Sequence, residues 1–293
     1  MKIIWLADSH FLLEIPALRE LFKEFVQAIA AEKPDILLLG GDMCTRAGLS
    51  QLLSTFRRTV LAPMYCILGN HEFLGGLVTA VRDQMASYVS MTSGVTWLSQ
   101  TKEPVWLTDG VALVGTETWG DARAGNLSSR NLRRRAHEFL YDQIEEIRVL
   151  TEACDSDTVC IARKVQAFLR GQGDEAAQHL DQVGRIAAEN ARQVVMLLHA
   201  PPFPEATLYR GHPDPIGLPF FCARAAGEVI RKLAEEYPHV QFTVLAGHTH
   251  CQAKVMVLPN LNILVHDPCG KGATSRWEVL EVDREGVGLQ TNI

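Results

Sequence analysis

The chain has 293 residues, 47% of them hydrophobic, which is enough to bury the core of one large domain or two small ones. Its net charge of -6 at pH 7 argues against a protein whose whole surface binds nucleic acid or an anionic membrane, although it is compatible with a local basic groove. The N-terminal apolar stretch is only a few residues long before Asp8 and His10 interrupt it, which is too short for the apolar region of a signal peptide or for a membrane span. This predicts a cytoplasmic protein.

Five short apolar runs bounded by turn residues predict strands that are buried on both faces, as in sheets covered by helices. They are residues 3–7, 35–41, 64–69, 194–199 and 242–247. A hairpin is expected over 104–115, because Asp109-Gly110 separates two apolar runs. Residues 261–289 are also typical of strands joined by turns.

Helical spacing of apolar residues predicts helices between these strands. The segments run from Leu18 to Ile29, with Pro16 near the start, from Leu77 to Tyr88, and from Ala226 to Tyr237. Residues from about 120 to 192 are charged, helical in spacing and almost without strand signals. We therefore expect a single domain over residues 1–293, with a helical insertion over about 120–192 outside a β-rich core.

Seven cysteines are scattered along the chain without a Cys-x-x-Cys pair. This odd number and spacing indicate neither a disulfide framework nor a cysteine zinc site. We expect mostly reduced cysteines that behave as small, half-buried apolar residues.

Each of the five apolar runs is followed by residue types that bind metals. A lone Asp or His after a strand is more often a cap or a structural residue, but five coincidences at strand ends favour a shared site. The residues are Asp8 and His10, then Asp42, then Asn70, His71 and Glu72, then His199, and finally His248 and His250.

Imidazole and oxygen donors without thiolates favour Mn, Fe, Co, Ni or Zn over Ca or Mg. The donors exceed the needs of one ion, and a bridging carboxylate would allow two divalent ions about 3.5–4 Å apart, an arrangement suited to in-line displacement at phosphorus. Hydrolysis of a phosphate ester is the reaction that this donor set predicts.

The order and spacing of these blocks resemble the calcineurin-like metallophosphoesterase superfamily. The blocks are DSH at 8–10, GD at 41–42, GNHE at 69–72, His199 and GHTH at 247–250, so the resemblance spans residues 3–250. It implies an α/β fold of four layers, in which helices flank a mixed two-sheet β-sandwich and the metals lie at the strand ends.

The resemblance also implies roles for the residues. Asp8, His10 and His250 would hold one ion, Asn70, His199 and His248 the other, and Asp42 would bridge the two. His71 would be no ligand but would protonate the leaving oxygen or stabilise charge, with Glu72 orienting it. A hydroxide formed from water held between the ions would attack phosphorus without a covalent enzyme intermediate.

Two segments are candidates for substrate contacts. Arg130 opens a run of four arginines that would form a basic lip for a second phosphate or a polyanion, or else a solvated helix face balanced by acidic neighbours. The proline-rich segment 199–215 is expected to be a rigid loop from which Tyr209, Arg210 and His212 reach the substrate.

The leading hypothesis is therefore a dinuclear phosphoesterase of a small or medium phosphate ester, with nucleic acid disfavoured as a substrate and no membrane partner. Monoesters, diesters and pyrophosphates are equally compatible with the donor set. Two alternatives stay open: a non-catalytic protein-interaction module on the same fold, and a single-metal hydrolase or oxygenase.

Overall fold

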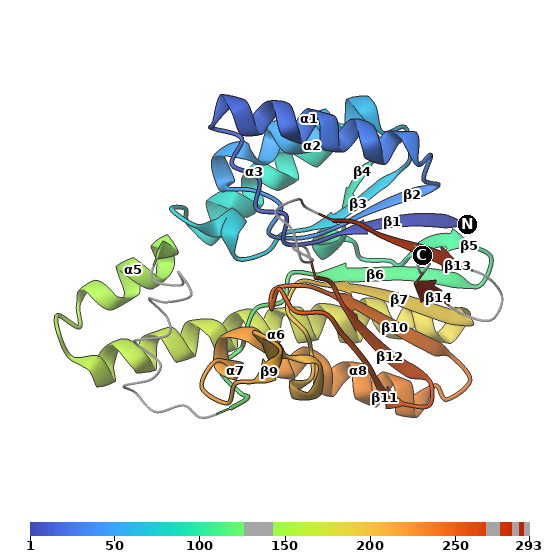
Figure 1. Ribbon diagram of the computed structural model, residues 1–293. Helices are drawn as coiled ribbons and strands as arrows, with labels where there is room; N and C mark the ends of the chain where they lie inside the picture. The colour runs from blue at the N-terminus through green and yellow to red at the C-terminus, as the bar shows by residue number, and fades with distance from the viewer. Residues whose placement is uncertain (126–142, 268–275, 283–286, 290–293) are drawn as a thin grey trace.

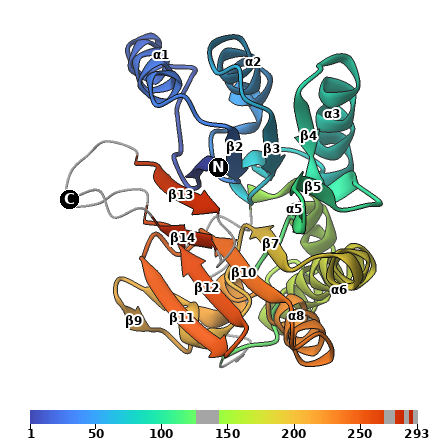
Figure 2. The same ribbon diagram turned by 90° about the vertical axis from the view of Figure 1, so that its right-hand side faces the viewer.

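The computed structural model describes residues 1–125, 143–267, 276–282 and 287–289. Two six-stranded sheets lie face to face, and helices cover the outer face of each (Figure 1). Figure 2 shows the same layers from the side, with α1, α2 and α3 above the sheets and α6 and α8 to the lower right of the second sheet. The predicted mixed two-sheet fold flanked by helices is confirmed.

The first sheet has a parallel centre and an antiparallel edge. Parallel pairing joins β1, β2, β3 and β4, while β13 and β14 extend the sheet on the other side of β1 in antiparallel register. In sheet order the strands are β14 (Val287–Leu289), β13 (Glu278–Val282), β1 (Lys2–Leu6), β2 (Ile36–Gly40), β3 (Met64–Ile67) and β4 (Val95–Trp97).

The second sheet also has a parallel centre, but both of its edge strands are antiparallel. One of these edges is the predicted hairpin, in which Gly110 takes a positive φ of 71°. The order is β11 (Ala253–Leu258), β12 (Leu261–Val265), β10 (Gln241–Ala246), β7 (Gln193–Leu198), β6 (Val111–Thr116) and β5 (Val105–Thr108). Parallel neighbours bring the carboxyl ends of β1, β2, β3, β7 and β10 to one edge of the sandwich.

Helices α1 (Pro16–Ala31), α2 (Leu49–Thr59) and α3 (Val78–Met91) cover the first sheet (Figure 1). Pro16 lies at the start of α1, where its missing N–H leaves no hydrogen bond unmade. Helix α2 was not expected from the sequence, although its buried Leu49, Leu52, Leu53 and Phe56 have helical spacing.

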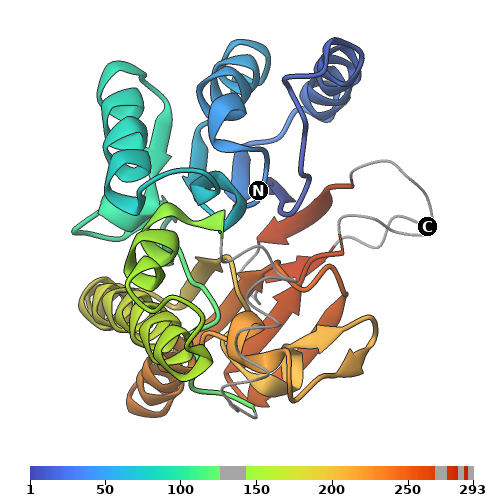
Figure 3. The same cartoon turned by 90° about the vertical axis from the view of Figure 1, so that its left-hand side faces the viewer.

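The predicted insertion is helical, but it is not separate from the core. It contains α5 (Glu145–Glu152) and the 33-residue α6 (Thr158–Asn190), and Figure 3 looks onto the end of the molecule where they begin. The first half of α6 packs with the first sheet's outer cluster, whereas Leu180, Val183 and Ala187 pack on the second sheet beside α8 (Arg224–Glu236). Both halves of α6 therefore pack into core clusters, which differs from the expectation of helices outside the core. The division of the chain into domains stays a prediction.

A third apolar cluster fills the space between the sheets. Ile3, Trp5 and Leu38 of the first sheet face Leu197 and Leu245 of the second, all of them at most 1% exposed. Their burial fixes how the two sheets are stacked, and it thereby sets the positions of the loops that leave the carboxyl ends of the strands.

The cysteines differ from the expectation in one place. Cys154 and Cys160 form a disulfide between α5 and α6, whereas Cys44, Cys66, Cys222 and Cys251 are free. The spacing rules missed this pair because only the turn between the two helices brings the sulfurs together. No helix among the described residues is both long and apolar enough to cross a bilayer.

Candidate metal centre

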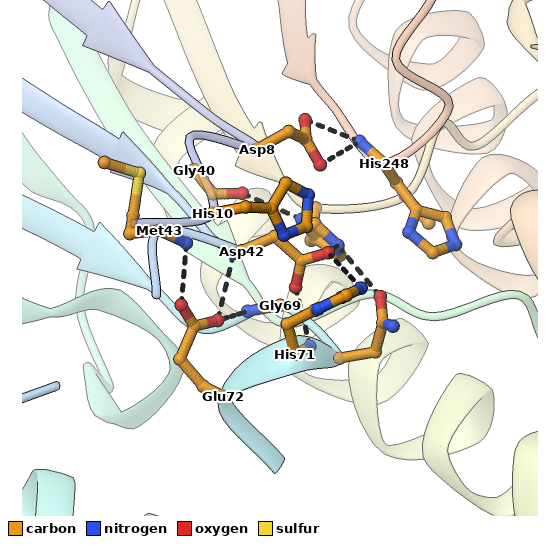
Figure 4. A network of polar contacts seen from close by, with 12 residues as sticks. Asp8, His10, Gly40, Asp42, Met43, Gly69, His71, Glu72 and His248 are labelled. Atoms are coloured by element: carbon orange, nitrogen blue, oxygen red, sulfur yellow. Dashed lines mark hydrogen bonds and ion pairs between the residues drawn. The ribbon is translucent and has the colours of Figure 1, made fainter. Parts of the chain in front are cut away.

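The seven predicted metal ligands come together at the carboxyl edge of the sandwich. Figure 4 shows four of them, Asp8, His10, Asp42 and His248, with their side chains close together. Three groups of donor atoms each lie within 4.8 Å of one another, and Asp42 belongs to two of them. The groups are Asp8, His10 and His250, then Asp42, His199 and His248, and thirdly His10, Asp42 and His71. Asn70 joins the second group through its Oδ1, which lies 3.2 Å from His199 Nε2.

Backbone hydrogen bonds hold the loops after β1 and β2 side by side. The amide of Asp8 donates to the Gly41 carbonyl and that of His10 to the Asp42 carbonyl, both at 3.0 Å. These bonds continue the β1–β2 pairing beyond the strands, so the two loops form one rigid platform.

The backbone is strained where the ligands lie. Asp8, His10, Asp42, His248 and His250 have positive φ values between 45° and 70°, and they make up five of the nine such non-glycine residues in the described ranges. A left-handed conformation is unfavourable for these residue types and persists only where the surrounding structure enforces it. The side chains are therefore directed into the site at a cost in backbone energy, which is typical of functional sites.

Two glycines let the loops approach each other. A Cβ at Gly69 would overlap with Oδ1 of Asp42, and one at Gly247 would overlap with Oδ2 of Asp8. Any side chain at these positions would displace a carboxylate of the centre.

Asp42 lies at the middle of the centre and is 1% exposed. Its Oδ1 accepts from the His71 amide at 2.7 Å, and its Oδ2 lies 3.3 Å from His199 Nε2 and 3.9 Å from His71 Nε2. One carboxylate thus faces loops from both sheets, as a bridging ligand would.

Glu72 is hydrogen-bonded to the backbone of two loops of the centre. Its buried carboxylate accepts four backbone N–H groups, at 2.7–3.1 Å, from Asp42, Met43, Cys44 and Gly69, and Figure 4 shows those of Asp42, Met43 and Gly69. Glu72 thereby ties the β2 loop to the β3 loop and fixes the backbone of Asp42. That Glu72 orients His71 stays a prediction.

Two backbone carbonyls set the orientation of the second sheet's imidazoles. Nδ1 of His199 donates to the Gly40 carbonyl at 3.0 Å, so Nε2 is the atom that faces Asp42. Nε2 of His248 donates to the carbonyl of Phe220, in α7 (Leu218–Phe221), at 2.8 Å. Sequence reasoning missed both partners, since a main-chain carbonyl has no residue-specific signal.

Asp8 and His250 complete the other end of the centre. Both Asp8 oxygens accept from the His248 amide, at 2.9 and 2.8 Å, and Oδ1 lies 3.6 Å from His250 Nε2. The Nε2 atoms of His10 and His250 face each other at 2.9 Å. Asp8 therefore connects the first sheet to the loop after β10.

The charges of the centre favour ionised carboxylates and two neutral imidazoles. Burial opposes ionisation of Asp42, but the charges of His199 and His71 outweigh it and hold its pKa well below the usual range. Burial lowers the pKa of His10 to about 4 and that of His248 to about 3, so both keep a lone pair at neutral pH. Burial also opposes protonation of His199, yet the charge of Asp42 raises its pKa to about 9.

These residues fit divalent transition-metal ions. The donors are carboxylate, amide and imidazole atoms, and no thiol is among the residues that form the three groups. Two imidazole nitrogens 2.9 Å apart and a buried carboxylate shared by two groups are arrangements that a bound cation would stabilise.

Three of the four predicted substrate residues lie on a small hairpin of β8 (Leu208–Tyr209) and β9 (His212–Pro213), namely Tyr209, Arg210 and His212. Its two-residue turn has positive φ at Arg210 and Gly211, as such a turn requires. The Tyr209 ring stacks on Phe221, which in turn contacts the His248 ring edge-on, with 5.2 Å between centroids in each pair. The structure thus connects Tyr209 to the centre, while Arg210 and His212 are exposed on the hairpin and Arg130 lies outside the described residues.

Comparison with known proteins agrees with this geometry. The model of the calcineurin-like phosphoesterase family matches residues 1–252. The chain belongs to this family. No curated protein sequence matches it significantly.

Two solved structures share the fold with low sequence identity. A phosphopantetheinyl hydrolase from Mycobacterium tuberculosis is 15% identical, with a TM-score of 0.58, over 90% of this chain and 88% of that one. A dimetal phosphatase from Danio rerio is 14% identical, also with a TM-score of 0.58, over 97% and 93%. At such identities the likeness concerns the fold alone.

Proposed function

We propose that this protein hydrolyses a phosphate mono- or diester with two divalent metal ions held at the carboxyl edge of the sandwich. The observation that carries the proposal is the convergence of donors from five strand ends on Asp42, which belongs to two donor groups. Family membership supports a phosphoesterase in general. The number of ions, their identity and the chemical step are parts of the proposal.

The proposed ligands follow the groups of donor atoms. Asp8, His10 and His250 would hold one ion, Asn70, His199 and His248 the other, and Asp42 would bridge them. Bound divalent ions would lower the pKa of a water molecule and neutralise charge on the phosphoryl oxygens. Mn, Fe, Co, Ni and Zn all suit these donors.

His71 is the residue that we propose acts on the substrate directly. Its side chain is 28% exposed, the amide of the same residue is fixed by Asp42, and its ring packs edge-on against His10 with 4.3 Å between centroids. A half-exposed imidazole held at the rim of the centre is placed to donate a proton to the leaving oxygen or to stabilise its charge. By distance alone His71 also qualifies as a ligand, so metal content is the test that separates the two roles.

The substrate would be a small or medium phosphate ester that reaches the centre past the β8–β9 hairpin. Tyr209, Arg210 and His212 are the proposed contacts, and the Arg210 guanidinium lies 5.2 Å from the centroid of the Tyr209 ring. A basic lip at Arg130 and a cytoplasmic location stay predictions from the sequence.

The test is hydrolysis of a chromogenic monoester and the matching diester, p-nitrophenyl phosphate and bis-p-nitrophenyl phosphate, by protein loaded in turn with Mn, Co, Ni and Zn. We expect metal-dependent release of nitrophenol and two equivalents of metal by elemental analysis. Metal-loaded protein that is inert toward both esters would favour a non-catalytic interaction module. One equivalent of metal would favour a single-metal hydrolase or oxygenase.

A further inference from the structure

A pocket of about 270 Å³ opens between the sheets, and none of the residues that line it is a predicted metal ligand. Figure 2 shows the strands around it, with β13 of the first sheet above β12 and β11 of the second. The lining includes Trp5, Glu278, Gln252, Lys254, Leu264 and Val265.

Glu278 breaks the apolar pattern of its strand. It pairs directly with Trp5 in the β1–β13 register, and the next residues on the same face, Leu280 and Val282, belong to the apolar cluster between the sheets. Strand alternation therefore predicts an apolar residue at position 278, yet the position holds a carboxyl group, and burial raises its pKa. Such a departure from pattern is typical of a functional position.

Lys254 supplies the opposite charge from the second sheet. It pairs directly with Leu264 in the β11–β12 register, and Leu264 belongs to the same inter-sheet cluster. The Lys254 side chain therefore lies on the face of its sheet that is turned toward Glu278. Within the described part of the chain, neither residue forms an ion pair, so the two charges line one pocket without neutralising each other.

We propose that this pocket binds a small zwitterion, with its ammonium group at Glu278 and its anionic group at Lys254. The volume corresponds to about nine water molecules, at roughly 30 Å³ each, which is the size of an amino acid. Trp5, Leu264 and Val265 provide an apolar wall for the methylene groups between the two charges. Each end of the ligand gains a charge-assisted hydrogen bond to a group that forms no ion pair within the described residues, although the charge of Arg276 acts on Glu278.

The experiment is an NMR titration of the full-length protein with glycine, β-alanine and γ-aminobutyrate, whose charges are separated by one more methylene group each time. Ethylamine and acetate serve as half-ligands. The readout is the shift of the Trp5 indole N–H signal, which a Trp5→Phe variant assigns. We expect saturable shifts with at least one amino acid, and at least tenfold weaker binding of both half-ligands.

Lys254→Gln and Glu278→Gln should each weaken binding about tenfold, while Glu281→Gln, on the opposite face of β13, should leave it unchanged. Asp42→Asn should also leave amino-acid binding unchanged, because no predicted metal ligand lines the pocket. This expectation does not depend on whether the protein hydrolyses esters. Loss of binding in Asp42→Asn would place the ligand at the metal centre and overturn the proposal. Absence of saturable shifts in the wild type, or wild-type affinity in the Lys254→Gln and Glu278→Gln variants, would overturn it too.

Discussion

The loops of the first sheet supply the carboxylates and the amide of the proposed metal centre, whereas the second sheet supplies three of its four proposed imidazole ligands. The first-sheet loops are fixed through their backbones, because one carboxylate, that of Glu72, accepts four amides from them. Two of the second-sheet imidazoles, His199 and His248, are fixed through their rings by the carbonyls of Gly40 and Phe220. A carboxylate is placed by the position of its loop. An imidazole must also turn the correct nitrogen toward the centre, and a hydrogen bond from its other nitrogen ensures this, so the two sheets use different supports.

Substitution of Asp42, the proposed bridging ligand, should have the largest effect on metal content and activity. Asp42→Asn removes the charge shared by the two donor groups, and we expect loss of bound metal together with a fall in kcat/KM on the order of 1,000-fold, or about 4 kcal/mol. Elemental analysis and ester hydrolysis measure the two losses. Asp83→Asn, an exposed change on α3, is the control and should alter neither. Retention of both metals by Asp42→Asn would contradict a bridging role.

His71→Ala separates chemistry from metal binding at the same loop. We expect wild-type metal content and a decrease in kcat of about 100-fold, because a positioned acid contributes roughly that much or more. The variant is assayed beside Asp42→Asn with the same metal and the same ester. If its metal content fell as far as that of Asp42→Asn, His71 would be a ligand.

Glu72→Gln tests the backbone support of the first-sheet loops. The amide has one acceptor oxygen in place of two, so buried N–H groups lose their partner, and we expect destabilisation of about 3 kcal/mol. A lower Tm, by roughly 5–10 °C, and weaker metal retention are the measurements. Glu24→Gln, exposed on α1, controls for the loss of one charge. An unchanged Tm would mean that the loops hold their position without Glu72.

The second-sheet imidazoles predict a pH dependence in protein freed of metal with EDTA. The folded-state pKa of His199 is raised to about 9 by Asp42, above the usual 6.5, so its stabilising effect is present below pH 6.5 and is lost as the pH rises through 9. Over this pH range the free energy of unfolding of the wild type should fall by about 2 kcal/mol more than that of His199→Gln. Thermal unfolding between pH 6 and 9.5 measures the difference, and parallel curves for the two proteins would contradict it.

The β8–β9 hairpin should give the smallest effect, because its Tyr209 reaches His248 by way of the Phe221 ring. Arg210→Ala removes a guanidinium that is exposed at the hairpin turn, and we expect KM to rise a few-fold, about 0.5–1 kcal/mol, with kcat unchanged. Arg163→Ala, on α6 and far along the chain, is the control. A kcat effect equal to that of His71→Ala would place Arg210 at the reacting phosphoryl group.

The convergence of the candidate ligands was predictable because two short-range signals coincide in this sequence. Apolar runs without alternation indicate strands buried on both faces, and Asp8, Asp42, His199 and His248 each follow such a run closely. Helices with a clear apolar face, such as α1 and α8, were predictable for the same local reason. The continuity of α6 was not predictable. Two helices that end at Gly171 and Gly173 and one helix that continues through them have the same apolar spacing on either side of these glycines.

Sequence by itself determined the residue types and their order along the chain: which strands are buried, and which oxygen and nitrogen donors follow them. Only the tertiary structure decided what supports those donors, since Glu72 accepts amides from residues about 30 positions away and His199 donates to a carbonyl 159 positions away. It also decided that Glu278 and Lys254 line one pocket and that Cys154 and Cys160 are bonded. The physical reason is that hydrogen bonds and ion pairs depend on distance in space, whereas a sequence pattern records only the local rules that form strands and helices.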